Sequence, residues 1–183
     1  MKRMMIFPTI VLFLLLSCNQ FLFSGTFPEE KVKSFADTEF TFPTDLIKDS
    51  PVLIALNIGT SRENGEVQQE ALIAWQYAVE GSNTSLRYAP FYHISVIEGA
   101  PFFVRGVIRR GLAESFEGLI EPERGGVLFL SKAKKFAEQA ELPIDGEPTV
   151  VVVSTDGTIT GYVKGKVDSL ALSTLVAIWE KAT

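Results

Sequence analysis

A nearly continuous apolar run at residues 52–58 is the feature that most restricts how this chain can fold. It consists of Val-Leu-Ile-Ala-Leu-Asn-Ile and lies between Pro51 and Gly59. Such runs are typical of strands that are covered on both faces, and those strands belong mostly to parallel sheets flanked by helices. The sequence therefore predicts a buried parallel strand and, with it, an α/β domain.

The segments that follow this strand predict a βαβ unit. A loop of glycines and polar residues at 59–65 leads into a segment whose apolar residues, among them Trp75, recur at helical spacing. Residues 91–97 predict a returning strand, which a right-handed crossover would place beside the first strand.

The rest of the chain predicts three helices and a hairpin. In order, we expect a helix over 101–115, a short strand over 126–130, a helix over 131–142, strands over 150–153 and 158–163, and a C-terminal helix. Ser131 is the expected N-cap of the second of these helices, and Asp168 or Ser169 that of the last. Asp156-Gly157 is a strong signal for a two-residue hairpin turn. The resulting order is β-α-β, a helical insertion, and β-β-α.

That order and one short motif resemble the thioredoxin fold. The motif is Gly146-Glu147-Pro148-Thr149, followed by an apolar strand, Asp156-Gly157, a second strand and Gly165. It resembles the matching segment of thioredoxin-like and peroxiredoxin-like proteins, in which the proline is usually cis and faces the active-site loop. The resemblance covers residues 35–182. It implies a three-layer α/β sandwich, with a central mixed sheet and helices on both faces, and a cis bond before Pro148.

Four further segments resemble the family of a mitochondrial ATP-synthase assembly factor and its bacterial relatives. They are residues 40–46, the helix that contains Trp75, residues 91–98, and the arginine-bearing helix over 101–115. This second resemblance implies a narrower relationship within the thioredoxin-like proteins.

The position of the redox site in that fold holds no thiol in this chain. The resemblance places two cysteines, two residues apart, after the first core strand, and here those positions are Ser61 and Asn64. Neither side chain can take part in a disulfide, and Cys18 is the only cysteine. Thiol–disulfide exchange and thiol peroxidase chemistry are therefore excluded. With one histidine and no free thiol, we also expect no catalytic residue, no cofactor and no metal.

The N-terminal residues resemble a bacterial lipoprotein signal. Lys2 and Arg3 precede an apolar stretch, and Leu-Leu-Ser-Cys at 15–18 resembles the lipobox, in which the cysteine is lipidated after cleavage. The stretch is about 13 residues long, whereas a bilayer-spanning helix needs about 20, so an uncleaved anchor is the weaker interpretation. We expect a signal peptide over 1–17, lipidation of Cys18, a lipidated tether over 18–34 and the folded domain over 35–183.

Removal of this signal would leave an acidic protein. It would carry 15 basic and 22 acidic residues, a net charge near −7. Nucleic acids bind clustered cations, so no nucleic-acid partner is expected. Membrane association at the cell envelope is expected to come from the lipid.

Two surfaces are candidates for binding. In thioredoxin-like proteins a groove between the first helix and the proline loop binds extended chains by backbone pairing, and the resemblance implies such a groove here. Its expected lining is Thr60, Ser61, Arg62, Asn64, Glu147, Pro148 and Thr149. The leading hypothesis is therefore a non-catalytic protein that binds a protein or peptide partner at the bacterial envelope.

The second surface is a basic face on the arginine-bearing helix. Arg105, Arg109 and Arg110, with the lysines at 132–135, could meet an acidic partner or an anionic headgroup. The simpler interpretation is a solvated helix face that pairs with Glu114 and Glu117. The neighbouring aromatic residues, Tyr88, Phe91, Tyr92, Phe102 and Phe103, are expected in the core.

Two alternative functions remain open. An envelope enzyme or redox-related factor could use Ser61 with His93, which requires their polar atoms to lie within about 5 Å of one another. A small-ligand or lipid carrier would need an apolar cavity between the helical insertion and the sheet. His93 is otherwise expected to be a half-buried structural residue.

Overall fold

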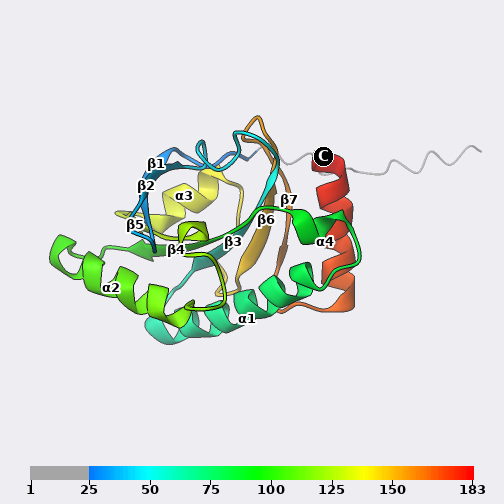
Figure 1. Cartoon of the computed structure of the whole chain (residues 1–183). Coiled ribbons are helices and arrows are strands. Elements are labelled where there is room, and N and C mark those ends of the chain that lie inside the picture. Colours follow the sequence, from blue (N-terminus) through cyan, green and yellow to red (C-terminus); the bar gives the residue numbers. More distant parts are fainter. Residues whose placement is uncertain (1–24) are drawn as a thin grey trace, which may run out of the picture.

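The computed structural model describes residues 25–183 (Figure 1). The signal peptide expected at 1–17, Cys18 and the first part of the tether lie outside the described residues. The strands are β1 (Glu30–Ser34), β2 (Glu39–Phe42), β3 (Val52–Ile58), β4 (Phe91–Glu98), β5 (Gly125–Leu130), β6 (Thr149–Val153) and β7 (Ile159–Lys164). The α-helices are α1 (Arg62–Glu80), α2 (Phe102–Ser115), α3 (Ala133–Gln139) and α4 (Ser169–Ala182), and the 3-10 helices are η1 (Ser85–Tyr88) and η2 (Pro122–Arg124).

The seven strands form one mixed sheet in the order β2-β1-β5-β4-β3-β6-β7. β3, β4 and β5 are parallel, and the other neighbouring pairs are antiparallel. All seven residues of β3 are buried, as the apolar run at 52–58 predicts. The βαβ unit is confirmed, because α1 connects β3 to its parallel neighbour β4.

Helices cover both faces of this sheet (Figure 1). On one face α3 packs with residues of the N-terminal strands in a core that includes Phe42 and Phe136. On the other face α1 and α4 pack in a core around Trp75 and Trp179. The indole N–H of Trp75 donates a 2.9 Å hydrogen bond to the carbonyl oxygen of Gly165. The three-layer α/β sandwich with a central mixed sheet is therefore confirmed.

The sheet has two ends that differ in what they carry. We call the end where β3, β4 and β5 finish the carboxyl end, and α1, α2 and α3 all begin there. Thr149 at the start of β6 pairs with Leu56 and with Lys164, so the start of β6, the finish of β7 and the start of α4 lie there too. The opposite end, with the start of β3 and the β6–β7 turn, is the amino end.

The first described residues belong to the folded domain and lie at the amino end. Gly25 accepts a hydrogen bond from the backbone N–H of Ile159, and Thr26 forms a β-bridge with Thr158. Phe27 is 4% exposed in the core, and β1 pairs with both β2 and β5. The boundary expected at residue 35 is therefore too late, since apolar and backbone contacts already fix the last part of the expected tether.

Two helix starts also differ from the expected ones. α1 begins at Arg62, within the expected loop 59–65, because the side chain of Ser61 caps the helix. α3 begins at Ala133 and not at Ser131, and its N-cap residue, Lys132, makes no capping hydrogen bond with its side chain. The carboxylate of Glu98, at the finish of β4, accepts from the N–H of Ala133 and takes the place of a cap.

The expected cis bond before Pro148 is wrong. Among the described residues the only cis peptide bond joins Phe42 to Pro43, so the bond from Glu147 to Pro148 is trans. The trans form is the favoured state of a peptide bond before proline. With this peptide bond trans, the carbonyl oxygen of Pro148 accepts a hydrogen bond from the N–H of Gly165. The thioredoxin-like strand order is present without this feature.

None of the helices within residues 25–183 combines the length and apolar character needed to cross a bilayer.

Candidate functional site

The start of α1 holds a closed hydrogen-bond network where redox proteins of this fold carry their thiols. The Oγ of Ser61 accepts from the backbone N–H of Asn64 at 3.1 Å. Asn64 Oδ1 accepts from the N–H and hydroxyl of Thr60 and from Nε2 of Gln68. Asn64 Nδ2 donates to the carbonyl oxygen of Gly146 at 2.8 Å. Both polar atoms of the Asn64 side chain are therefore engaged within the protein.

Gln68 joins this network to the finish of β3. Its side chain is fully buried, and it bonds both backbone groups of Ile58, with distances of 3.2 Å to the N–H and 3.1 Å to the carbonyl. Asn57 adds a 3.0 Å hydrogen bond from Nδ2 to the carbonyl oxygen of Gly65. Buried amides are rarely left unpaired, so this pairing holds the helix start in a fixed position on the strand.

The loop before β6 is fixed from its other side by Lys164. The ammonium group lies 2.6 Å from a carboxylate oxygen of Asp145 and 3.0 Å from one of Glu147. The bonds to Asp145 and Glu147 raise the pKa of Lys164, and the bond to Asp145 has the larger effect. The bond from Lys164 also lowers the pKa of Asp145. Gly146 has a φ of 85°, a left-handed conformation that glycine adopts readily and that L side chains rarely adopt.

The expected groove residues therefore lie together, but the network bridges the space between them. Thr60, Ser61, Arg62 and Glu147 are exposed, while Pro148 and Thr149 are buried. The carbonyl of Gly146 is bonded to Asn64, and the N–H of Glu147 donates to Oδ1 of Asp145 at 3.2 Å. These two backbone groups have their partners within the chain, so the loop does not offer them for pairing with an extended peptide.

The exposed apolar residues gather at the same end of the sheet. Eight large apolar side chains are exposed in the described residues, and six of them lie in the first turns of helices or in the loop at the carboxyl end: Val67, Phe102, Phe103, Val107, Ile144 and Leu170. Phe102 and Phe103 are 86% and 82% exposed. The expectation that these two and Tyr88, which is 80% exposed, lie in the core is wrong, whereas Phe91 is buried and Tyr92 packs against the core.

Phe102 and Phe103 are exposed because α2 is attached to the body by only one side. No residue of α2 is buried, and the helix projects beyond the edge of the sheet at the left of Figure 1. The residues that would pack it, such as Val104 and Ile108, are only partly buried. Helical periodicity predicted the helix, but it could not show how little of the body lies behind its first turn.

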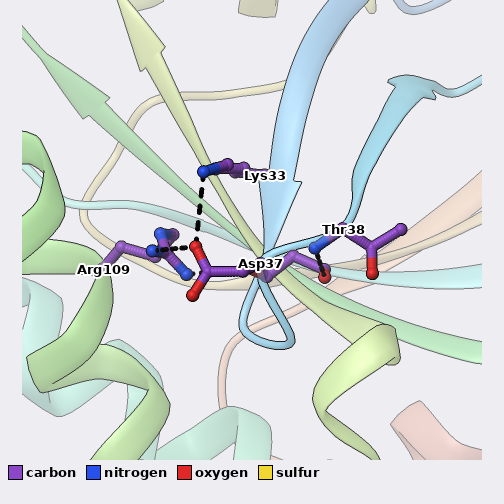
Figure 2. Close-up of polar contacts among 5 residues, drawn as sticks. Lys33, Asp37, Thr38 and Arg109 are labelled. Atoms are coloured by element: carbon purple, nitrogen blue, oxygen red, sulfur yellow. Dashed lines mark hydrogen bonds and ion pairs between the residues drawn. The ribbon is translucent and has the colours of Figure 1, made fainter.

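Arg109 provides the main polar attachment of α2 (Figure 2). Its guanidinium donates to the carbonyl oxygen of Ser34 at 3.1 Å and forms an ion pair with Asp37, which also pairs with Lys33. Asp37 has a φ of 64° in the tight β1–β2 turn, where Thr38 donates to Oγ of Ser34. Desolvation would raise the pKa of Asp37, but its bonds to Lys33 and Arg109 outweigh that effect and lower it.

Two of the three arginines of the expected basic face are engaged in contacts within the protein. Arg105 donates to the carbonyl oxygen of Ala100 at 3.0 Å, and its guanidinium lies 5.2 Å from the centre of the Phe129 ring. Arg109 pairs with Asp37 and not with the expected Glu114 or Glu117. Only Arg110 of the three arginines points its charge to solvent without a hydrogen bond or ion pair in residues 25–183.

His93 lies in the core and is separate from the start of α1. It is 2% exposed between the rings of Phe91 and Phe116, and its Nε2 donates to Oε1 of Gln76 at 2.8 Å. Gln76 turns its oxygen toward His93 because its amide group donates to Glu80. Burial lowers the pKa of His93 to about 4, so the ring is neutral near pH 7.

The pair proposed for an envelope enzyme is therefore not assembled. Gln76, which contacts His93, follows Ser61 by about four turns of α1, a distance of about 22 Å along the helix axis. Ser61 and His93 cannot share a proton over that distance. Among residues 25–183 there is also no group of three or more His, Cys, Asp or Glu side chains that could hold a metal ion.

A cavity of about 490 Å³ lies between the end of α2 and the β1–β2 turn, whereas the carrier alternative needs one between the helical insertion and the sheet. Apolar residues line part of it, including Phe35 and Phe116, whose rings stack at 5.7 Å. Glu114 and Glu117 line it as well and would repel the carboxylate of a fatty acid. The cavity therefore gives little support to the carrier alternative.

Comparison with known proteins supports the fold assignment. No family model matches the sequence, and no curated protein matches it. Among solved structures, yeast Sco1 superposes with a TM-score of 0.59 at 9% identity, covering 87% of this chain and 97% of that chain. A protein of Aquifex aeolicus VF5 with a proposed role in electron transport gives 0.57 at 13%, covering 87% and 98%. BsSco, a member of the Sco family of cytochrome c oxidase assembly proteins, gives 0.53 at 10%, covering 87% and 94%.

These likenesses define the class of the domain. The domain has a thioredoxin-like fold, and the resemblance in sequence places serine and asparagine at the positions of the redox cysteines. At such low sequence identity the likeness concerns the fold. The narrower resemblance to ATP-synthase assembly factors stays a prediction.

Proposed function

We propose that this chain is a lipid-anchored, thiol-free thioredoxin-like protein that binds a protein or peptide at the surface of a bacterial membrane. The observation that carries the proposal is the pair Phe102 and Phe103, more than four-fifths exposed at the carboxyl end of the sheet. Contiguous exposed apolar groups on a soluble domain are typical of interaction sites, and aromatic residues supply much of the binding energy at interfaces.

The network around Asn64 supports a binding role over a chemical one. The position of the redox site holds no thiol, yet the network keeps the start of α1 and the loop before β6 in a fixed arrangement. A rigid surface loses little conformational entropy when a partner binds. The start of α1 and the loop before β6 can therefore serve as a preformed part of the binding surface without thiol chemistry.

The path of the chain also favours the carboxyl end of the sheet as the binding surface. Gly25 lies at the amino end, and Cys18 precedes it by seven residues, which span at most about 25 Å. A lipid on Cys18 would hold the protein from the amino end. The carboxyl end, with Phe102 and Phe103, would then be directed away from the anchoring membrane and toward other envelope proteins.

Affinity capture from membranes tests this proposal. The lipidated protein and the Tyr88→Ser variant should retain the same protein, whereas a double Phe102→Ser, Phe103→Ser variant should lose it. Tyr88 is an equally exposed aromatic residue just before β4, away from the carboxyl end, and therefore serves as the matched control. Capture that is equal for all three proteins, or that recovers no protein, would contradict the proposal.

A Cys18→Ala variant tests the anchor separately. Loss of membrane fractionation in this variant, together with acyl chains on Cys18 of the mature wild-type protein by mass spectrometry, is the expected result. An unmodified Cys18 thiol in the mature protein would contradict the anchor.

A further inference from the structure

We infer that the partner carries an apolar segment flanked by carboxylates, and that this segment docks on a ridge formed by Phe102, Phe103, Val107, Arg110 and Lys132. The inference rests on the proposed function, because it specifies the class of partner for the same end of the sheet. We call these five residues the docking ridge.

The apolar part of the ridge follows from the geometry of α2. Phe103 and Val107 are four residues apart, and Phe102 and Arg110 are eight apart, so all four side chains lie on one face of the helix. Phe102, Phe103 and Val107 are 86%, 82% and 69% exposed. The other side of the helix, with Val104 and Ile108, is half-buried against the body. Arg109 follows Phe102 by seven residues and lies on the same side of the helix as Phe102, where its guanidinium donates to the carbonyl oxygen of Ser34. The helix thus presents three adjacent apolar side chains that nothing in residues 25–183 covers.

Lys132 lies beside the start of α2. The N–H of Gly99, just before α2, donates to the carbonyl oxygen of Leu130. Lys132 follows Leu130 by two residues. The Glu98 carboxylate accepts from the N–H of Ala133, which ties the same two connections together. The start of α2 and the start of α3 are therefore neighbours, which places Lys132 near the first turn of α2.

The charges on this ridge select the partner. Arg110 and Lys132 are exposed, and neither has an ion pair within the described residues. They form a local cationic rim on a chain whose net charge is −5. A partner with carboxylates on either side of an apolar group would satisfy both parts of the ridge, and complementary charges would also speed its association.

The same features argue against two other occupants. A second copy of this chain would bring the same two cations to the contact and would place like charges opposite one another. The bilayer that holds the proposed anchor is reached from the amino end of the sheet, whereas the ridge is at the carboxyl end. A separate acidic protein segment fits both the charge and the position.

Zero-length crosslinking with a carbodiimide tests the inference, because this reagent joins a lysine amine to a carboxylate that touches it. The lipidated full chain is treated in membranes, and the crosslinked peptides are identified by mass spectrometry. We expect Lys132 joined to an Asp or Glu of another protein, with Leu, Ile, Val, Met or an aromatic residue within about one helical turn of that acid. Lys181, near the end of α4, is the control and should give no such crosslink.

Two charge variants sharpen the result. Lys132→Arg keeps the charge but removes the reactive amine, so partner capture should persist while the crosslink disappears. A double Arg110→Glu, Lys132→Glu variant should reduce capture at least tenfold. If capture still requires Phe102 and Phe103 but the charge reversal leaves it unchanged, the carboxylate inference is overturned and the proposed function stands. If the wild-type chain captures no protein, or if Lys132 crosslinks only to other copies of this chain, both the inference and the proposed function are overturned.

Discussion

Asn64 Nδ2 donates a 2.8 Å hydrogen bond to the carbonyl oxygen of Gly146 and thereby joins the first turn of α1 to the loop before β6. The resemblance to thioredoxin-like proteins places a redox cysteine at the position of Asn64. Here the same two segments are bonded to one another. The amide of Asn64 has a structural role at this position.

Replacing Asn64 with alanine should destabilise the protein by about 1–3 kcal/mol, because Gly146 and Gln68 lose a partner in a partly buried site. Urea unfolding measures the change. Arg62→Ala is the control, since its ion pair with Glu66 is solvent-exposed and should contribute less than about 0.5 kcal/mol. Equal unfolding free energies for the two variants would show that the Asn64 bonds are not structural.

His93 should make stability depend on pH between about 6.5 and 4. Its pKa is near 6.5 in the unfolded chain and about 4 in the folded protein, where burial disfavours the charged ring. Above pH 6.5 the ring is neutral in both states. As the pH falls, the unfolded chain binds a proton that the folded protein does not, so stability is lost. The loss from pH 7 to pH 5 should be about 2 kcal/mol.

The matched variant for this effect is His93→Gln, which removes the only histidine of the chain. Its unfolding free energy should be lower at pH 7 but should change much less between pH 7 and pH 5. Chemical denaturation at both pH values measures the difference. A wild-type slope that persists in the variant would assign the pH dependence to other groups.

Arg109→Ala should loosen α2 without unfolding the sheet. The guanidinium bonds Ser34 and Asp37 in the β1–β2 turn, and α2 has no buried residue to hold it otherwise. Amide hydrogen exchange in α2 should become several-fold faster, because sparsely packed elements open at low cost. Arg110→Ala, one residue further on and free of such bonds, should leave these exchange rates unchanged; equal acceleration in both variants would contradict the attachment.

A double Phe102→Ser, Phe103→Ser variant should change the unfolding free energy by no more than about 0.5 kcal/mol, as is usual for exposed sites. Phe116→Ala, in contrast, removes a ring that is 3% exposed and stacks on Phe35, and should cost about 3–5 kcal/mol. Thermal or urea unfolding of both variants makes the comparison. A large loss in the Phe102 and Phe103 variant would mean that these side chains are packed.

The sequence predicted the fold best where a single local property, such as burial or a turn signal, determines the structure. The apolar run at 52–58 required burial on both faces and therefore fixed the central strand and its parallel neighbour. The Asp168 cap depends on local backbone chemistry and is present. The chain also reverses at Asp156-Gly157, but through the five residues 154–158 between β6 and β7 and not through the expected two-residue hairpin turn. Such short-range signals do not need knowledge of what lies across the molecule.

Features that depend on distant contacts were missed. Glu98 takes the place of the Ser131 cap from another strand, and Asn64 reaches Gly146, which is 82 residues away in the sequence. The exposure of Phe102 depends on how far α2 extends past the sheet, and periodicity carries no such information. Gly106 and Gly111, which lower the helix propensity of α2, were the one available sign that this helix is unusual.

The most direct test of the binding role uses a photocrosslinking amino acid placed at Phe103 or at Tyr88 of the protein in living cells. Both sites are highly exposed, but only Phe103 is at the carboxyl end of the sheet. We predict one discrete crosslinked protein of higher mass from Phe103 and none from Tyr88. Crosslinks only to lipid, equal crosslinks from both sites, or none from Phe103 would contradict the account.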